Sequence, residues 1–173
     1  MKNWVVKADF GRFRYMAASI QNEHLLDQAV SEAMIFDVQR FLGMALFYDI
    51  AQEIDDNNIS AKYDTLLNGG AYKCGEETIY LQGLKACLCL YAFARYTKRD
   101  GIHHTATGVV HKQSDFSEPI SDKTRQRLSS DDTALAEALK LECIDYLNRN
   151  SANIPLWRCT RKKRNPTFRT IGL

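Results

Sequence analysis

The sequence predicts an all-α fold, a bundle of about four principal helices with a long extended loop arm and an extended basic C-terminal tail. The first observation is a nearly uncharged helix over Thr78–Lys98, in which Lys85 is the only charge between Leu84 and Phe93. A helix that is apolar on all sides is buried among several neighbours. The second is residues 100–120, about twenty residues without helical periodicity, which is long for a loop in a compact domain. The third is the tail, residues 158–173, which contains six basic residues and no acid.

Apolar residues at intervals of three and four predict a helix that follows a cap at Asn22 and ends near Leu42. Its apolar face comprises Leu26, Val30, Ala33, Met34, Val38, Phe41 and Leu42. Gly43 offers a break, and a second helix is expected to follow it as far as Ile54.

A short helix is expected over Ala61–Leu67, ended by Gly69 and Gly70, because glycine readily adopts the left-handed backbone of a helix C-terminus. Residues 1–20 are predicted to form an extended segment that lies on the core.

The last helix is expected to begin at an N-cap, Ser121, and to end near Asn148. Its apolar stripe is predicted to comprise Leu135, Leu139, Cys143 and Leu147. Ser129–Asp132 are polar, so the helix is expected to bend there, to start late, or to cross solvent between neighbours.

The length of 173 residues predicts one helical domain, residues 1–157, from which the arm at 100–120 projects, followed by the tail at 158–173. The whole chain carries a formal charge of +2 and the tail +6, so residues 1–157 carry −4. The charge is therefore divided between a mildly acidic body and a basic tail.

The five cysteines, an odd number without Cys-x-x-Cys spacing, indicate a reducing compartment rather than a disulfide framework. The N-terminal residues lack the apolar run of a signal peptide. Lys85 and Arg95 interrupt the best candidate for a membrane span. We therefore expect a soluble protein made in the cytoplasm, with no membrane partner.

Catalytic motifs are missing from the sequence. It contains no phosphate-binding loop, no Gly-x-Ser-x-Gly elbow and no His-Glu-x-x-His zinc motif. We expect neither an enzyme nor a cofactor. Asp55–Asn58 could suggest calcium, but the glycine and the distal glutamate of a calcium loop are missing, which favours a turn.

The histidines of the arm, His103, His104 and His111, form the only histidine cluster, and no cysteine lies nearby to complete a zinc site. We expect them to be solvated or to lie at an interface, and we expect no metal. Glu76 and Glu77 are expected to stabilise the N-terminal end of the central helix dipole.

The basic tail has three interpretations on its charge pattern alone. It could dock on the acidic body of a neighbouring subunit, it could be a solvated tail, or it could contact nucleic-acid phosphates while Trp157 or Phe168 stacks on bases.

Three stretches together resemble the helical head–tail connector proteins, also called adaptor or head-completion proteins, of tailed bacteriophages. They are Ile20–Tyr48, Leu66–Tyr96 and Thr107–Lys123. The residues that carry the likeness are Glu32-Ala33, Asp37, Leu42-Gly43 and Phe47-Tyr48; Gly69-Gly70, Gly83-Leu84-Lys85 and Ala94-Arg95-Tyr96; and Gly108-Val109-Val110, Lys112, Asp115, Ser117-Glu118 and Ser121-Asp122-Lys123.

The resemblance implies a virion structural protein that forms a ring of about twelve copies below the portal, in the neck at the head–tail interface. The genome would pass through the lumen of the ring, with possible non-specific DNA contact. The implied partners are other copies of the chain, the portal protein and adjacent neck or tail proteins. The protein would be made in the cytoplasm of the bacterial host.

The arm and the tail are then the candidate interfaces. The arm residues are Ile102, His103, His104, Val109, Val110, Lys112, Asp115, Phe116, Ser117 and Glu118. The tail residues are Trp157, Arg158, Arg161, Lys162, Lys163, Arg164, Phe168 and Arg169. A helical nucleic-acid-binding regulator that acts through the basic tail is the alternative function.

Overall fold

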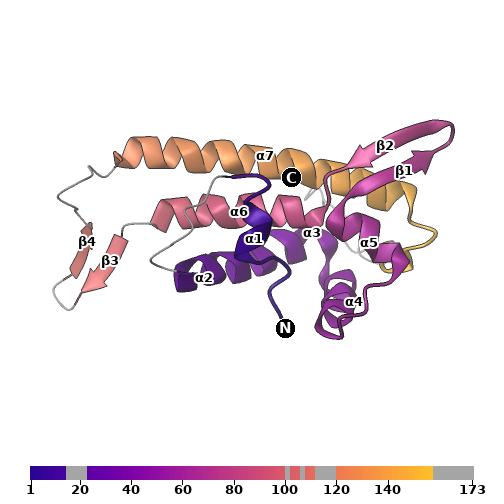
Figure 1. The fold of residues 1–173 in the computed structure, drawn as a ribbon, viewed down its shortest axis with the longest axis horizontal. Coiled ribbons are helices and arrows are strands. Elements are labelled where there is room, and N and C mark those ends of the chain that lie inside the picture. The colour runs from indigo at the N-terminus through magenta and orange to yellow at the C-terminus, as the bar shows by residue number, and fades with distance from the viewer. Residues whose placement is uncertain (15–22, 100–101, 106–107, 112–119, 158–173) are drawn as a thin grey trace, which may run out of the picture.

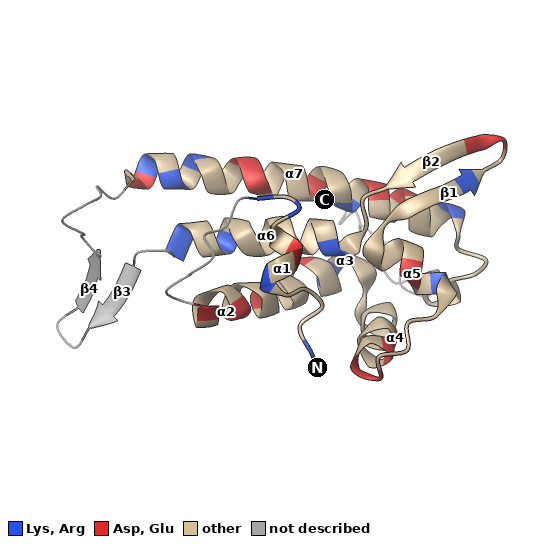
Figure 2. Ribbon diagram, viewed as in Figure 1, with Lys and Arg blue, Asp and Glu red and all other residues tan. Residues whose placement is uncertain are grey.

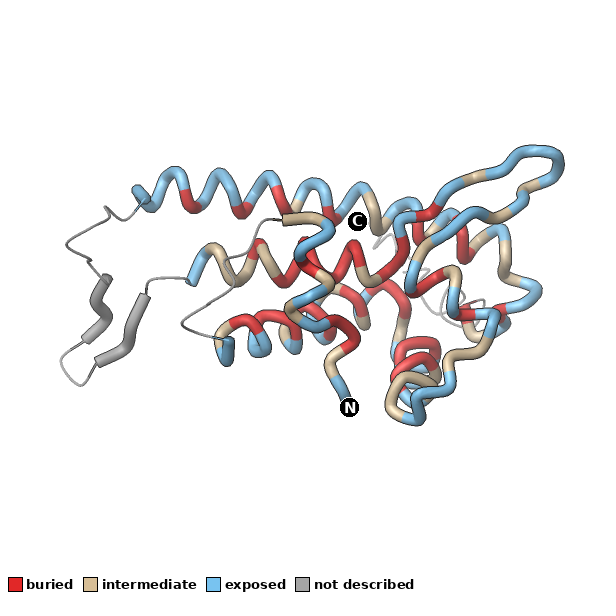
Figure 3. Tube along the Cα trace, in the orientation of Figure 1, coloured by how far each residue is buried: buried red, intermediate tan, exposed pale blue. Residues whose placement is uncertain are grey.

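The computed structural model describes residues 1–14, 23–99, 102–105, 108–111 and 120–157, and only the backbone of 102–105 and 108–111. The fold is largely helical, as predicted (Figure 1). Its two longest helices, α6 (Leu84–Arg99) and α7 (Asp122–Arg149), lie side by side. α6 is the buried helix that the sequence predicts, because most of its residues between Leu84 and Ala94 are shielded from solvent by α2, α5 and α7 (Figure 3).

The helix predicted to end near Leu42 is one helical path in three parts. α2 (Glu23–Ala33) leads into a π-helical turn, η1 (Met34–Val38), and then into α3 (Gln39–Leu42). All seven apolar residues predicted to share one face are buried. Gly43 then breaks the path with a φ of +79°, and α4 (Met44–Asp55) follows it. The predicted break and second helix are confirmed.

The N-terminal residues pack on the core as predicted, but they contain a short helix, α1 (Lys7–Phe10), instead of being wholly extended. Trp4, Val5 and Phe10 are buried, and the Trp4 ring stacks on Phe47 with centroids 4.8 Å apart. Residues 15–20 of the predicted segment lie outside the described residues.

The predicted start of the central helix at Thr78 is wrong. α5 (Ala61–Asn68) leads into an antiparallel hairpin of β1 (Gly70–Cys74) and β2 (Glu77–Leu81), and α6 begins only at Leu84. Glu76 and Glu77 therefore lie at the hairpin turn rather than at a helix N-terminus. The residues of β2 explain the strand, since Thr78, Ile79 and Tyr80 are β-branched or aromatic.

α7 begins at its predicted cap, where the Ser121 hydroxyl accepts the backbone N–H of Thr124 at 3.2 Å. The helix continues unbroken through Ser129–Asp132, so the predicted late start is wrong, and the burial of Ser129 and Asp132 contradicts a helix that crosses solvent there. Two of these polar residues are buried because each has a partner: the Ser129 hydroxyl donates to the carbonyl of Ala94, and Asp132 accepts from Arg14. The predicted stripe is correct at Cys143 and Leu147, but Leu135 is exposed and Ala136 is buried instead.

The predicted extended arm contains a second antiparallel hairpin, β3 (Ile102–Thr105) and β4 (Gly108–His111). The two hairpins project at opposite ends of the long axis of the molecule (Figure 1). In the part of the chain that is described, no helix is long and apolar enough to cross a membrane.

Candidate interaction surfaces

The structure places half of the predicted arm residues on the β3–β4 hairpin. His103 pairs in register with Val110, and His104 pairs with Val109, while Ile102 begins β3. The remaining predicted arm residues, Lys112, Asp115, Phe116, Ser117 and Glu118, lie outside the described residues. The backbone therefore brings Ile102, His103 and His104 together with Val109 and Val110 on one small two-stranded sheet.

Most of the predicted tail residues also lie outside the described residues, from Arg158 to Arg169. Trp157 is the exception, and its predicted role in base stacking or partner contact is corrected. The side chain is only 8% exposed and belongs to the hydrophobic core. Its indole N–H donates to the Asn148 side-chain carbonyl at 3.1 Å. Trp157 therefore fixes the end of the helical body beside the last turn of α7.

The acidic turn at Asp55–Asn58 forms as predicted. The Lys2 backbone N–H donates to the Asp55 carboxylate at 2.7 Å, and Asn57 adopts a φ of +52°. Within the residues that the structure describes, no three His, Cys, Asp or Glu side chains gather where they could hold a metal ion. The side chains of His103, His104 and His111 lie outside that description.

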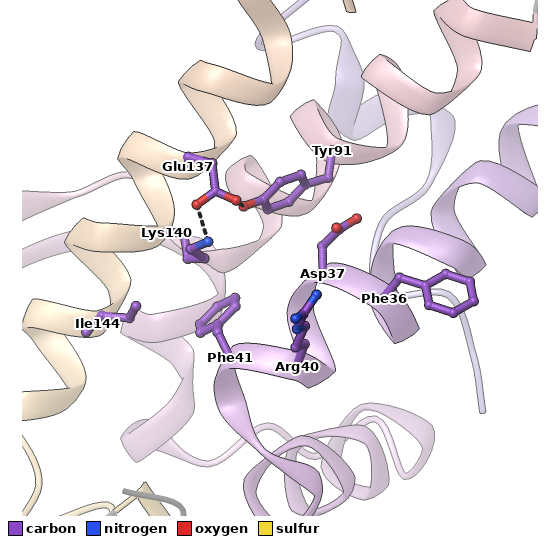
Figure 4. Close-up of a pocket in the computed structure, with 8 residues that line it drawn as sticks. All are labelled: Phe36, Asp37, Arg40, Phe41, Tyr91, Glu137, Lys140 and Ile144. Atoms are coloured by element: carbon purple, nitrogen blue, oxygen red, sulfur yellow. Dashed lines mark hydrogen bonds and ion pairs between the residues drawn. The ribbon is translucent and has the colours of Figure 1, made fainter. Parts of the chain in front are cut away.

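The sequence did not predict a groove that runs beside the π-helical turn. It lies between η1, α3, α6 and α7 and encloses about 290 Å³ (Figure 4). Its lining residues are Phe36, Asp37, Arg40, Phe41, Tyr91, Glu137, Lys140 and Ile144. π-helical turns are rare and are frequent at functional sites. The sequence carries no periodic signal for this turn, because the seven core residues fit an ordinary α-helix.

Ion pairs fix the floor of this groove. The Arg95 guanidinium donates to the Asp37 carboxylate at 2.7 and 3.1 Å. The Tyr91 hydroxyl donates to Glu137 at 2.5 Å, and Lys140 contacts the other oxygen of the same carboxylate (Figure 4). The hydrogen bonds from Lys140 and Tyr91 lower the pKa of Glu137, while burial raises the pKa of Tyr91. Both shifts move titration away from neutral pH, so these groups suit a fixed polar network better than proton transfer.

Exposed apolar side chains lie beside the groove. Phe36, which lines it, is 60% exposed and points away from the Glu137 cluster (Figure 4). Phe36 also lines a second hollow together with Ile35 and Met44, and Met44, at the start of α4, is 66% exposed. Tyr48, one turn beyond Met44 on α4, is exposed as well. Large exposed apolar side chains that gather in one place indicate an interaction surface. The arrangement is suited to contact with another macromolecule.

The two projecting hairpins differ in their charged surroundings. α6 ends toward the β3–β4 hairpin with Lys98 and Arg99, whereas the turn of the β1–β2 hairpin carries Glu76 and Glu77 (Figure 2). Arg99 is paired with Glu32 at 2.7 Å. The opposite ends of the molecule therefore present different surfaces to any partner.

One protein family matches residues 38–167, and its description reads "Family of unknown function (DUF6712)". The chain belongs to the DUF6712 family. The matched residues include α3 to α7, both hairpins and the first part of the basic tail. The DUF6712 match therefore begins in the π-helical turn and includes all the predicted interface residues except Phe168 and Arg169. No curated protein and no solved structure matches this chain.

Proposed function

We propose that this DUF6712 protein is a virion structural protein, a head-to-tail connector subunit that forms a ring below the portal in the neck of a tailed phage. The genome passes through the ring, and the partners are other copies of the chain, the portal protein and adjacent neck or tail proteins. The three stretches that resemble connector proteins support this proposal, and so does the largely helical body from which they come.

The observation that carries the proposal is the β3–β4 hairpin, which stands clear of the helical body (Figure 1) and whose second strand, β4, belongs to the stretch that resembles the connector arm. A single two-stranded hairpin is marginally stable in water at best, because it buries little apolar surface. A hairpin held away from its own core is therefore suited to pack on a partner. The hairpin lies between α6 and α7 in the chain, so it is attached to the two longest helices of the protein.

Deletion of His103–Phe116 tests this proposal. The helical body keeps its core without these residues, so the variant is expected to fold, with an unchanged circular dichroism spectrum. It is expected to fail to support filled, tailed particles when it replaces the wild-type protein during infection. Tyr80→Ser, an exposed substitution in the other hairpin, is the matched control and is expected to support them. Normal particles from the deletion variant would refute the role of the arm.

A nucleic-acid-binding regulator is the second candidate, and the six basic residues of the tail favour it. Electrostatic binding to duplex DNA weakens steeply as salt rises, because each neutralised phosphate releases counterions. A gel-shift titration at two salt concentrations, with the full chain and with residues 1–157, distinguishes the candidates. The regulator requires salt-sensitive binding that is lost with the tail. The connector does not depend on affinity for free duplex, so an absence of binding at both salt concentrations would exclude the regulator.

A further inference from the structure

Among the described residues, two surfaces expose large apolar side chains, and they come from different elements of the molecule. The first, the π-turn surface, comprises Ile35, Phe36, Met44 and Tyr48. The second, the α7 flank, comprises Leu128, Asp131, Leu135 and Glu142. We propose that the π-turn surface of one copy packs against the α7 flank of a second copy. This inference rests on the proposed ring and names the two faces that would join its subunits.

The π-turn surface is shaped to receive a ridge of side chains. A hollow of about 580 Å³ runs between the exposed residues of η1 and the start of α4. Ile35, Phe36 and Met44 line it together with Gly43, which has no side chain to fill the space. Tyr48 is one turn beyond Met44 on the same face of α4. Arg95 lies under the Phe36 ring, with its guanidinium carbon 5.8 Å from the centroid, which supports the ring from below.

The α7 flank is a matching ridge. Leu128 is 46% exposed and Leu135 is 48% exposed, whereas Ala136, Cys143 and Leu147 of the same helix are buried. Residues separated by three or four positions lie on one side of a helix, so Leu128, Asp131, Leu135 and Glu142 form a continuous row. Two apolar side chains seven residues apart, with small or polar neighbours, form the narrow seam that packs into a groove on another helix.

The α7 flank lies on the side of α7 that is turned away from η1. Thr133, Glu137, Lys140 and Ile144 line the grooves beside η1 and form one row along the helix. Leu128, Asp132 and Leu135 form the other row, and Asp132 reaches Arg14 in the N-terminal segment. One copy can therefore use both surfaces at once. A contact between two different faces repeats from copy to copy and closes into a ring when the rotation allows it.

Charge favours the same pairing. Asp131 and Glu142 border the apolar row of the α7 flank, and neither forms an ion pair with a described residue. Arg40 lies on the rim of the π-turn surface and is exposed. Complementary charges at the rim of an apolar contact fix its register and select the partner. The same charges would oppose contact between two α7 flanks or between two π-turn surfaces.

The experiment measures the mass of the full-length protein by light scattering over a range of concentrations. Phe36→Lys and Leu135→Lys each place a charge in the proposed contact, and each is expected to weaken assembly at least about tenfold. Both side chains are exposed, so neither substitution should unfold the protein. Tyr80→Lys places the same charge on an exposed aromatic position outside both surfaces, and it is expected to assemble like the wild type.

A charge exchange tests the pairing itself. Arg40→Glu is expected to weaken assembly, and the addition of Asp131→Arg and Glu142→Arg in the same chain is expected to restore it. Assembly that is indifferent to Phe36→Lys and Leu135→Lys would overturn this inference while leaving the ring proposal intact. A wild-type protein that stays monomeric at every concentration would overturn it as well. The arm deletion tests the connector proposal independently.

Discussion

At the scale of single residues, Gly69 and Gly83 hold the β1–β2 hairpin against the start of α6. Both have positive φ values, +79° and +91°, which side-chain-bearing residues rarely adopt. A Cβ atom at Gly83 would collide with the backbone of Leu67, Asn68 and Gly69, and one at Gly69 would collide with Leu81 and Gln82. The two backbones can approach this closely only because both residues lack side chains.

We therefore expect Gly83→Ala to destabilise the protein by about 2–4 kcal/mol, from backbone strain and from displacement of the hairpin. Urea denaturation followed by circular dichroism measures this loss. Gly75→Asn is the matched control. Gly75 also has a positive φ, but a Cβ atom there meets open space, and asparagine tolerates this backbone. If Gly83→Ala and Gly75→Asn lost equal stability, the close approach of the two backbones at Gly83 would not be the cause of the loss.

The ion pair between Glu32 and Arg99 predicts a pH dependence. The Arg99 hydrogen bond lowers the pKa of Glu32 from its usual 4.5, and partial burial opposes this shift. A lowered folded-state pKa stabilises the protein above the unfolded value, and that stability is lost as the pH falls through the folded value. Glu32→Gln is therefore expected to melt below the wild type at pH 7, with the difference shrinking as the pH falls below 4.5 and disappearing once the pH is below the lowered folded-state pKa. A difference in melting temperature between Glu32→Gln and the wild type that stays constant with pH would contradict a stabilising role for the ionised Glu32 carboxylate.

Individual residues were predictable where one periodic pattern determines them. The seven core residues of the first helical path follow an interval of three and four, and all are buried. Asp132 and Trp157 were not predictable in this way. Asp132 can be buried because Arg14 donates hydrogen bonds to its carboxylate, and Arg14 lies 118 positions earlier in the chain. Trp157 can pack in the core because Asn148 accepts its indole N–H. Neither contact leaves a local signal.

At the scale of elements, α6 and α7 form the central pair, and their cysteines report how closely they pack. Cys87 and Cys89 on α6 and Cys143 on α7 are buried. Burial raises the pKa of Cys89 and of Cys143 to about 12, and it raises the pKa of Cys87 as well. The Cys87 thiol also donates to the carbonyl of Ala136 across the helix pair at 3.3 Å.

Because the thiolate is the reactive form, we expect these three cysteines to resist thiol reagents in the native protein. The measurement uses a Cys74→Ser, Cys159→Ser variant, in which only these three thiols remain. At pH 8 it should show no rapidly reacting thiol in buffer and three in denaturant. Rapid reaction of any thiol in the native variant would mean that the core around α6 opens readily.

The elements divide into those with a strong local pattern and those without one. The helices with long apolar stripes and clear caps were predictable, including Gly43 as a break and Ser121 as a cap. The β1–β2 hairpin was missed because its residues continue directly into an apolar helix, so that the end of one element resembles the start of the next. The π-helical turn was missed because its hydrogen bonding differs from an α-helix without changing which residues are apolar.

At the scale of the whole molecule, a rigid helical pair carries a hairpin toward each end of a long molecule (Figure 1). The interface residues predicted on the arm are placed partly on one of these hairpins. The π-turn surface was not predictable, because its exposed residues come from η1 and α4 and only the break at Gly43 brings them together. In the proposed ring, the arm, the π-turn surface and the α7 flank would be separate faces through which one chain contacts its neighbours.

The central claim is that copies of this chain assemble into a closed ring, and electron microscopy of the purified full-length protein tests it most directly. We expect particles of uniform diameter with rotational symmetry and a central opening wide enough for duplex DNA. Wild-type fields that contain only single copies, or open chains that never close, would contradict it.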